Sequence, residues 1–134
     1  MEQNREIAGP KIVYAEDSPV VQKIAVKALH DAGFAVVETF TTGRQALDYV
    51  LQTTPGEISL ILSDIEMPEM DGISFCKALR EHSETASIPF VFFSSIMDEE
   101  IRQRCEAVGA NRSFSKPELD EVVAAIVELL GRPG

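Results

Sequence analysis

Reactive side chains stand directly after several short apolar segments of this sequence. Three acids, one hydroxyl and one ammonium occupy such places: Glu16, Asp17, Asp64, Ser94 and Lys116. Three carboxylates that lie close together repel one another unless a cation compensates their charge. Mg²⁺ suits such a group, because it takes oxygen ligands and is usually held by a few carboxylates together with waters and phosphate oxygens.

The same residue types are sufficient for phosphoryl transfer to a carboxylate. A carboxylate beside a metal can attack phosphorus and give an aspartyl-phosphate. The metal and a lysine would stabilise the charge on the transferring group, and the hydroxyl of Ser94 could donate a hydrogen bond to one of its oxygens. This chemistry requires a fold that brings residues far apart in the sequence to one place.

The apolar segments predict five strands, at residues 11–15, 34–38, 60–63, 90–93 and around Phe114. Segments of helical periodicity separate them, and we expect helices to begin after Ser18, after Thr42, near Ile73, at Asp98 and at Pro117. The fourth helix has a thin apolar face. Five strands that alternate with five helices predict an α/β fold, a doubly wound parallel sheet with helices on both faces.

Ligands of such sheets bind beyond the carboxyl ends of the strands, where the winding direction reverses. Four of the five predicted strand ends carry the reactive side chains named above. The second strand is followed by Thr41 and Thr42 and has neither acid nor base there, as expected for a strand one step away from the site. The sequence therefore predicts one acidic site at the carboxyl edge of the sheet.

The composition indicates one acidic globular domain. The chain has 134 residues with 12 basic and 22 acidic side chains, a formal net charge of −10 and 45% hydrophobic residues. This charge argues against binding to nucleic acid or to an anionic membrane surface. We find no signal-peptide pattern and no apolar run of membrane-spanning length. Cys76 and Cys105 lack CxxC spacing, which favours reduced thiols in a cytoplasmic protein.

Four short motifs, in this order and spacing, resemble the CheY-like receiver domain of two-component response regulators. They are Glu16-Asp17, Asp64 within the segment 64–72, Ser94-Ser95 and Lys116-Pro117. The resemblance covers residues 11–131, and we expect residues 1–10 to be an N-terminal extension and 132–134 a C-terminal tail. It implies a five-stranded (βα)5 flavodoxin-like sheet in the strand order 2-1-3-4-5.

The resemblance also implies roles for individual residues. Asp64 would accept a phosphoryl group from the phosphohistidine of a histidine kinase. Mg²⁺ would be held by Glu16, by Asp17 more directly, by Asp64 and by the backbone carbonyl of Glu66. Ser94 would be the switch hydroxyl, Ser95 the small residue beside it, and Lys116 the phosphate-binding lysine. The peptide bond between Lys116 and Pro117 would be cis.

Segments 63–68, 93–95, 107–110 and 115–119 also resemble the receivers of CheV-type chemotaxis coupling proteins. Three positions depart from the usual pattern of the family. Ser113 replaces an aromatic residue, which puts in doubt the usual coupling of a hydroxyl shift to an aromatic rotation. Glu66 adds an acid near the phosphoacceptor and could alter dephosphorylation, and Glu16 replaces the commoner Asp.

We therefore expect a phosphorylation-controlled signalling switch that binds Mg²⁺, a histidine kinase or histidine phosphotransfer domain, and a downstream target protein. Two alternatives remain at this point. One is a degenerate receiver that binds partners without phosphorylation, which Ser113 would suit. The other is a Mg²⁺-dependent phosphatase or phosphotransferase, for which the chain offers no substrate cap.

Overall fold

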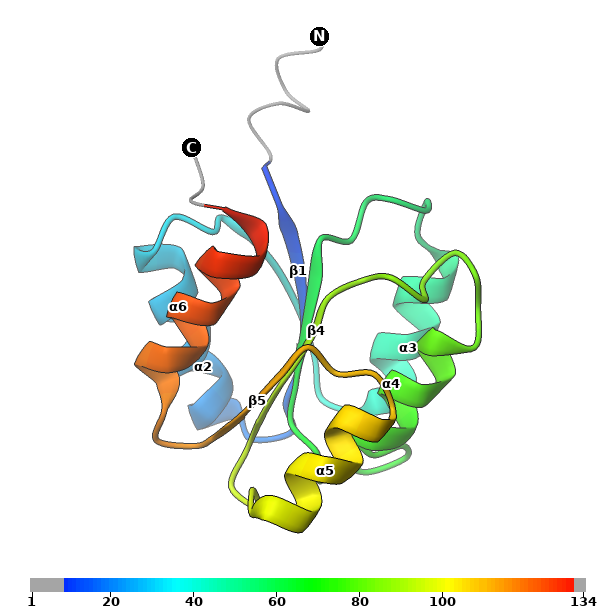
Figure 1. Cartoon of the computed structure of the whole chain (residues 1–134). Coiled ribbons are helices and arrows are strands. Elements are labelled where there is room, and N and C mark those ends of the chain that lie inside the picture. The colour runs from blue at the N-terminus through cyan, green and yellow to red at the C-terminus, as the bar shows by residue number, and fades with distance from the viewer. Residues whose placement is uncertain (1–8, 132–134) are drawn as a thin grey trace, which may run out of the picture.

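Five strands form one parallel sheet in the order β2-β1-β3-β4-β5 (Figure 1). The computed structural model describes residues 9–131. The strand bounds are β1 Lys11–Ala15, β2 Val36–Phe40, β3 Leu60–Ser63, β4 Phe90–Ser94 and β5 Arg112–Ser115. Every neighbouring pair is parallel. The predicted fold class and the predicted strand order are therefore confirmed.

Helices alternate with the strands and cover both faces of the sheet. Figure 1 shows α2 and α6 on one side of the sheet and α3 and α4 on the other, with α5 near the carboxyl ends of the strands. The helix bounds are α2 Pro19–Asp31, α3 Gly43–Gln52, α4 Gly72–Arg80, α5 Glu99–Ala107 and α6 Leu119–Leu130. The predicted caps Ser18 and Thr42 accept hydrogen bonds from the amides of Val21 and Gln45.

Two predicted elements are displaced by about two residues: the second strand, which spans Val36–Phe40 and not 34–38, and the start of the last helix. The second strand begins at Val36 and not at residue 34, because the amide of Phe34 donates to the carbonyl of Leu29 and closes the end of α2. The last helix begins at Leu119 and not at Pro117, because residues 115–118 form a turn in which the Glu118 amide donates to the Ser115 carbonyl.

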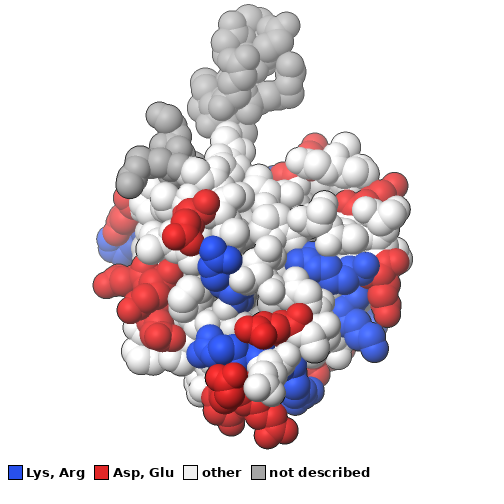
Figure 2. All heavy atoms as spheres, viewed as in Figure 1, with Lys and Arg blue, Asp and Glu red and all other residues white. Residues whose placement is uncertain are grey.

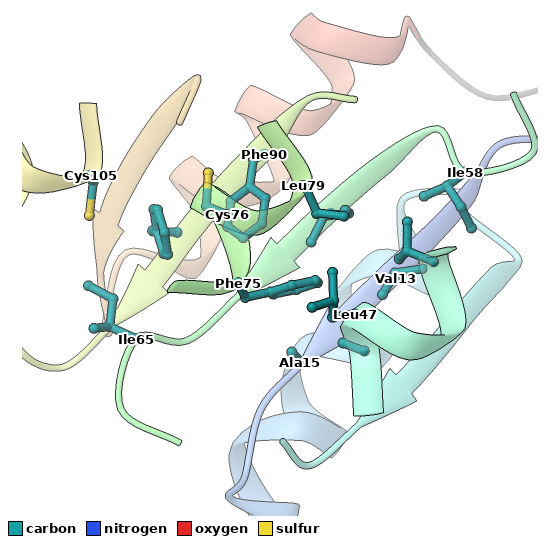
Figure 3. Close-up of a cluster of buried hydrophobic side chains, with 14 residues drawn as sticks. Val13, Ala15, Leu47, Ile58, Ile65, Phe75, Cys76, Leu79, Phe90 and Cys105 are labelled. Carbon is teal, nitrogen blue, oxygen red and sulfur yellow. The ribbon is translucent and has the colours of Figure 1, made fainter. Parts of the chain in front are cut away.

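Alternation along the strands divides the core into two layers. Ile12 and Tyr14 of β1 pack toward α2 and α6, whereas Val13 and Ala15 pack toward α3 and α4. Figure 3 shows the second layer, in which Phe75 and Leu79 of α4 lie beside Phe90 of β4. Because β1, β3 and β4 are buried from both sides, the ends of these strands are held rigidly.

Both cysteines are free and buried in this second layer. Burial raises the pKa of the Cys76 thiol to about 11, with its neighbours Arg80 and Cys105 exerting smaller effects. The Cys76 thiol donates to the carbonyl of Val108. The two thiols are therefore free core side chains and form no disulfide, in agreement with the reduced thiols that the sequence favours.

The predicted domain bounds stay a prediction. Most of the expected extension 1–10 and the whole expected tail 132–134 lie outside the described residues. Among the helices that are described, none is both long and apolar enough to cross a membrane.

Gly72 starts α4 in direct contact with the end of β3. A Cβ atom at this position would lie 2.0 Å from the backbone oxygen of Asp64 and 3.0 Å from Cε1 of Phe92. The Gly72 amide also donates to the carbonyl of Ile65 over 2.8 Å. The absence of a side chain at residue 72 therefore sets how closely α4 approaches the backbone of Asp64.

We predict that Gly72→Ala lowers the free energy of unfolding by about 1–3 kcal/mol, because the methyl group must push apart two packed backbone segments. Urea unfolding measures the change. The matched control is Ser74→Ala, at an exposed position in the same helical turn, which should change stability by less than about 0.5 kcal/mol. Equal stability of the two variants would contradict the prediction.

Candidate functional site

The carboxyl ends of four strands bring the predicted side chains to one edge of the sheet. Glu16 and Asp17 follow β1, Asp64 follows β3, Ser94 ends β4 and Lys116 follows β5. One side-chain oxygen from each of the three acids lies within 4.8 Å of the other two. The predicted acidic cluster is therefore present in the structure.

Lys116 forms ion pairs with two of these carboxylates. Its Nζ lies 2.9 Å from Oε1 of Glu16 and 3.1 Å from Oδ2 of Asp64. Burial disfavours the ammonium, but the hydrogen bonds and negative charges of the two acids outweigh this effect and raise the pKa of Lys116 above its usual value. The lysine is therefore charged at neutral pH and fixed between the two acids.

Glu16 is the most buried of the three acids, with 0% of its surface exposed. Its Oε2 accepts a hydrogen bond from the amide of Ser18 over 3.1 Å, and the Tyr14 hydroxyl lies 3.5 Å from its Oε1. Burial raises the pKa of Glu16, although the hydrogen bond from Lys116 opposes this effect. Burial also raises the pKa of Tyr14, with the Glu16 charge adding to it. The phenol therefore stays protonated beside this carboxylate.

Asp64 is held by its own loop. The amide of Ile65 donates to its Oδ1 over 2.7 Å, and the hydroxyl of Ser63 donates to its backbone carbonyl over 2.7 Å. The Asp64 amide donates to the carbonyl of Ala15 in β1. Only 5% of the residue is exposed. The carboxylate is thus oriented from both ends, with Oδ1 on the backbone and Oδ2 on Lys116.

The three acids fit a divalent cation that prefers oxygen ligands. Their separation allows one oxygen of each to contact one ion, and carboxylates are the ligands that Mg²⁺ takes. Asp17 is exposed and would hold the ion at the mouth of the site, whereas Glu16 and Asp64 form its floor. Glu66, whose backbone carbonyl was the fourth predicted ligand, lies in the loop after β3 with its side chain exposed.

Ser94 is buried at the end of β4 with 1% of its surface exposed. Its Oγ accepts a hydrogen bond from the amide of Ile96 over 3.2 Å, and its carbonyl accepts one from the amide of Lys116 over 3.0 Å. The hydroxyl therefore orders the loop that leads to α5. Ser95, the predicted small residue, follows it and is exposed.

The expected cis bond between Lys116 and Pro117 is wrong, because no peptide bond within residues 9–131 is cis. The turn at residues 115–118 already directs Lys116 toward the acids with a trans bond. Both the amide and the hydroxyl of Ser115 donate to Oε1 of Glu118 over 2.8 Å. Trans is the lower-energy form of such a bond by about 0.5–1 kcal/mol. Pro117 itself is exposed in the turn.

Ser113, the departure in β5, is buried and contacts α5. Its carbonyl accepts a hydrogen bond from Nη1 of Arg102. Sequence reasoning missed this arginine, and it also missed Tyr14 and Gln22. The Nε2 of Gln22 donates to the carbonyl of Glu16 over 3.1 Å. The only sequence signal for Gln22 is its place one turn into the helix that follows the acids.

Comparisons with known proteins agree with this geometry. The response regulator receiver domain family matches residues 12–128. A probable chemotaxis protein CheY of Rhizobium etli is 29% identical over 88% of this chain and 89% of its own length. A protein-glutamate methylesterase/protein-glutamine glutaminase of Archaeoglobus fulgidus is 36% identical over 81% of this chain, which spans only 30% of that protein. A chemotaxis protein CheV3 of Helicobacter pylori is 27% identical, and the match covers 91% of this chain and 41% of the relative.

Solved structures share the fold. The chemotaxis response regulator CheY4 of Vibrio cholerae superposes with a TM-score of 0.77 and 30% identity, covering 89% of this chain and 96% of that one. The receiver domain of sensor histidine kinase PA1611 from Pseudomonas aeruginosa superposes with a TM-score of 0.81 and 25% identity. The match covers 92% of this chain and 99% of that one. Its structure has a magnesium ion coordinated in the active site cleft.

The matched span runs from β1 to α6 and includes all four strand ends that carry the acids, the hydroxyl and the lysine. Fold, site and sequence therefore lead to the same conclusion: this chain belongs to the response regulator receiver domain family of two-component signalling.

Proposed function

We propose that this chain is a phosphoacceptor switch, in which Asp64 receives a phosphoryl group from the phosphohistidine of a histidine kinase or a histidine phosphotransfer domain. The observation that carries the proposal is the environment of Asp64. Its carboxylate is almost buried, lies 3.1 Å from the ammonium of Lys116, and shares an acidic cluster with Glu16 and Asp17.

In the transfer, a carboxylate oxygen of Asp64 attacks phosphorus. A P–O bond forms while the P–N bond to histidine breaks, and the imidazole nitrogen leaves with the bonding electron pair. In hydrolysis, a water oxygen attacks the same phosphorus, the bond to Asp64 breaks, and inorganic phosphate is released. The chain thus catalyses only its own phosphorylation and dephosphorylation and acts on no separate substrate.

Two side chains are placed to stabilise the phosphoryl oxygens. Lys116 already lies against Asp64 and can follow the new negative charge by a small movement of its ammonium. The hydroxyl of Ser94 accepts a hydrogen bond from Ile96, so its own proton stays available for donation to a phosphoryl oxygen. Once Ser94 turns toward the phosphoryl group, the amide of Ile96 loses this partner and the loop before α5 is released.

Glu16, Asp17 and Asp64, with the backbone carbonyl of Glu66, would hold Mg²⁺ at this site. When bound, Mg²⁺ supplies positive charge that offsets the charge of the transferring phosphoryl group. The buried Glu16 helps by keeping both the ion and Lys116 close to Asp64, because its carboxylate is fixed by Ser18 and the helix that follows.

The proposal extends to the setting of the protein. We place the receiver at residues 11–131 and the chain in the cytoplasm, with a downstream protein that recognises the phosphorylated face. The likeness to CheY and CheV3 proteins supports a chemotaxis-type pathway. We propose no direct contact with nucleic acid or membrane, in keeping with the net charge of −10.

We predict that Asp64→Asn abolishes the response to beryllofluoride, which mimics a phosphoryl group on a carboxylate. In the wild type with Mg²⁺, titration should shift the amide NMR signals of Ile65, Ser94 and Lys116. The matched control is Asp48→Asn, an exposed acid on α3, which should respond as the wild type does. Shifts that persist in Asp64→Asn would contradict the assignment of Asp64. A wild type without shifts or acetyl-phosphate labelling would favour the phosphorylation-independent binding module, and turnover of small phosphate esters would favour the phosphatase.

Asp17→Asn should weaken Mg²⁺ binding by about tenfold or more, because the ion loses one of three charged ligands. Titration of the unphosphorylated protein with MgCl₂, followed by the same amide signals, measures the affinity. Since Asp17 is exposed, the fold should be unchanged, and Asp48→Asn again serves as the control. An unaltered affinity would place the ion elsewhere.

Glu66→Ala should lengthen the lifetime of the aspartyl-phosphate severalfold. The exposed carboxylate two residues after Asp64 can orient the water that attacks phosphorus, and alanine removes this acceptor. Phosphate release after labelling with acetyl phosphate measures the lifetime. The control is Glu84→Ala, which removes another exposed acid, one that is distant from Asp64 in the sequence. Equal lifetimes in the wild type and in Glu66→Ala would refute the role of this acid.

A further inference from the structure

Helix α5 has little apolar attachment to the rest of the molecule. Cys105 is its only buried residue, as the thin apolar face in the sequence predicted. Figure 2 shows basic and acidic side chains interspersed over the lower part of the molecule in this view, where Figure 1 places α5. A helix with so few apolar contacts is held by a small number of directed bonds, and each of them therefore matters more to its position.

One of these bonds is made to Ser113 of β5. Nη1 of Arg102 donates to the carbonyl of Ser113. Cys105 lies beside the same residue: burial raises the pKa of its thiol, and the Ser113 side chain opposes this effect. Arg102 and Cys105 are three residues apart and so lie on one face of the helix. Ser113 is therefore one residue at which α5 is joined to the sheet.

Ser113 is also connected to the acidic site through its own strand. It pairs with Phe92 of β4, and two residues later Ser115 pairs with Ser94. The next amide, that of Lys116, donates to the carbonyl of Ser94. A displacement of Ser94 or Lys116 therefore acts on the carboxyl end of β5, and Arg102 is bonded to the middle of the same strand.

The small side chain of Ser113 leaves room for this arrangement. A groove of about 300 Å³ lies between α5 and β5, and Arg102, Glu106 and Ser113 are among its lining residues. The charge of Arg102 also reaches Glu118, whose pKa is lowered chiefly by its hydrogen bonds from Ser115 and to a smaller extent by this arginine. Arg102 is therefore bonded to the backbone of β5, and its charge acts on the turn that positions Lys116.

We propose that Arg102 is the positioning residue through which a change at the Asp64–Lys116 site reaches α5. The inference rests on the proposed function, since the change is the arrival of a phosphoryl group. When Ser94 turns toward that group and releases the amide of Ile96, the end of β5 adjusts with it. Arg102, bonded to the backbone of β5, then shifts α5 as a unit.

The test compares Arg102→Gln with the wild type by amide NMR, before and after addition of Mg²⁺ and beryllofluoride. Without ligand, loss of a charged hydrogen bond should speed hydrogen exchange of α5 amides by about tenfold or more and leave α2 and α3 unchanged. With ligand, the signals of Ile65 and Lys116 should shift as in the wild type, while the shifts within α5 should be largely lost.

Three further variants separate transmission from general loosening of α5. Arg102→Lys keeps a donor and should restore part of the α5 response. Ser113→Ala should retain the response, because the acceptor of Arg102 is a backbone carbonyl. Arg104→Gln alters an exposed arginine of the same helix and should behave as the wild type.

The outcomes distinguish this inference from the proposed function. Undiminished α5 shifts in Arg102→Gln, with the Ile65 shift intact, would overturn the inference alone, as would equal losses in Arg104→Gln. A wild type whose α5 signals do not move while Ile65 does would also overturn it. Absence of the Ile65 shift from the wild type would overturn the proposed function and the inference together.

Discussion

The burial of two carboxylates beside one ammonium is the constraint on which this site depends. Glu16 and Asp64 are almost inaccessible to water, and Lys116 lies about 3 Å from both. An uncompensated buried charge costs several kcal/mol, so the three positions are tied to one another. One ammonium does not balance two acids and the neighbouring Asp17, and the remaining negative charge is what makes the site receptive to a cation.

The sheet meets this constraint because its parallel strands end at one edge. β1, β3 and β4 are buried on both faces. Glu16 and Asp64 follow directly after β1 and β3, and Ser94 is the last residue of β4. The loop backbones then orient the side chains: Ser18 fixes Glu16, and Ile65 fixes Asp64. Gly72 allows α4 to close against Asp64. Packing of the core thus determines the distances between charges that are far apart in sequence.

Much of this arrangement could be predicted from the sequence. Unbroken apolar strands and helical periodicity are local patterns, and they yielded the fold class and the strand ends at Glu16, Asp64 and Lys116. The rest depends on tertiary contacts. The start of β2 depends on a bond from Phe34 to the end of α2. The bond before Pro117 is trans, and it lies in a turn closed by Glu118. Neither contact corresponds to a pattern of residue types that can be recognised in a single sequence.

Ser113 shows how one substitution can be interpreted only with its surroundings. In the sequence it is a small residue at a position where an aromatic one is usual. This departure supported the hypothesis of a degenerate receiver that binds partners without phosphorylation. In the structure the same position accepts a bond from Arg102 and lies against Cys105. A ring that rotates in a pocket and an arginine bonded to a strand can both link α5 to the sheet. The arginine differs in that its acceptor is backbone, so the link depends on movement of β5 itself rather than on the side chain at residue 113.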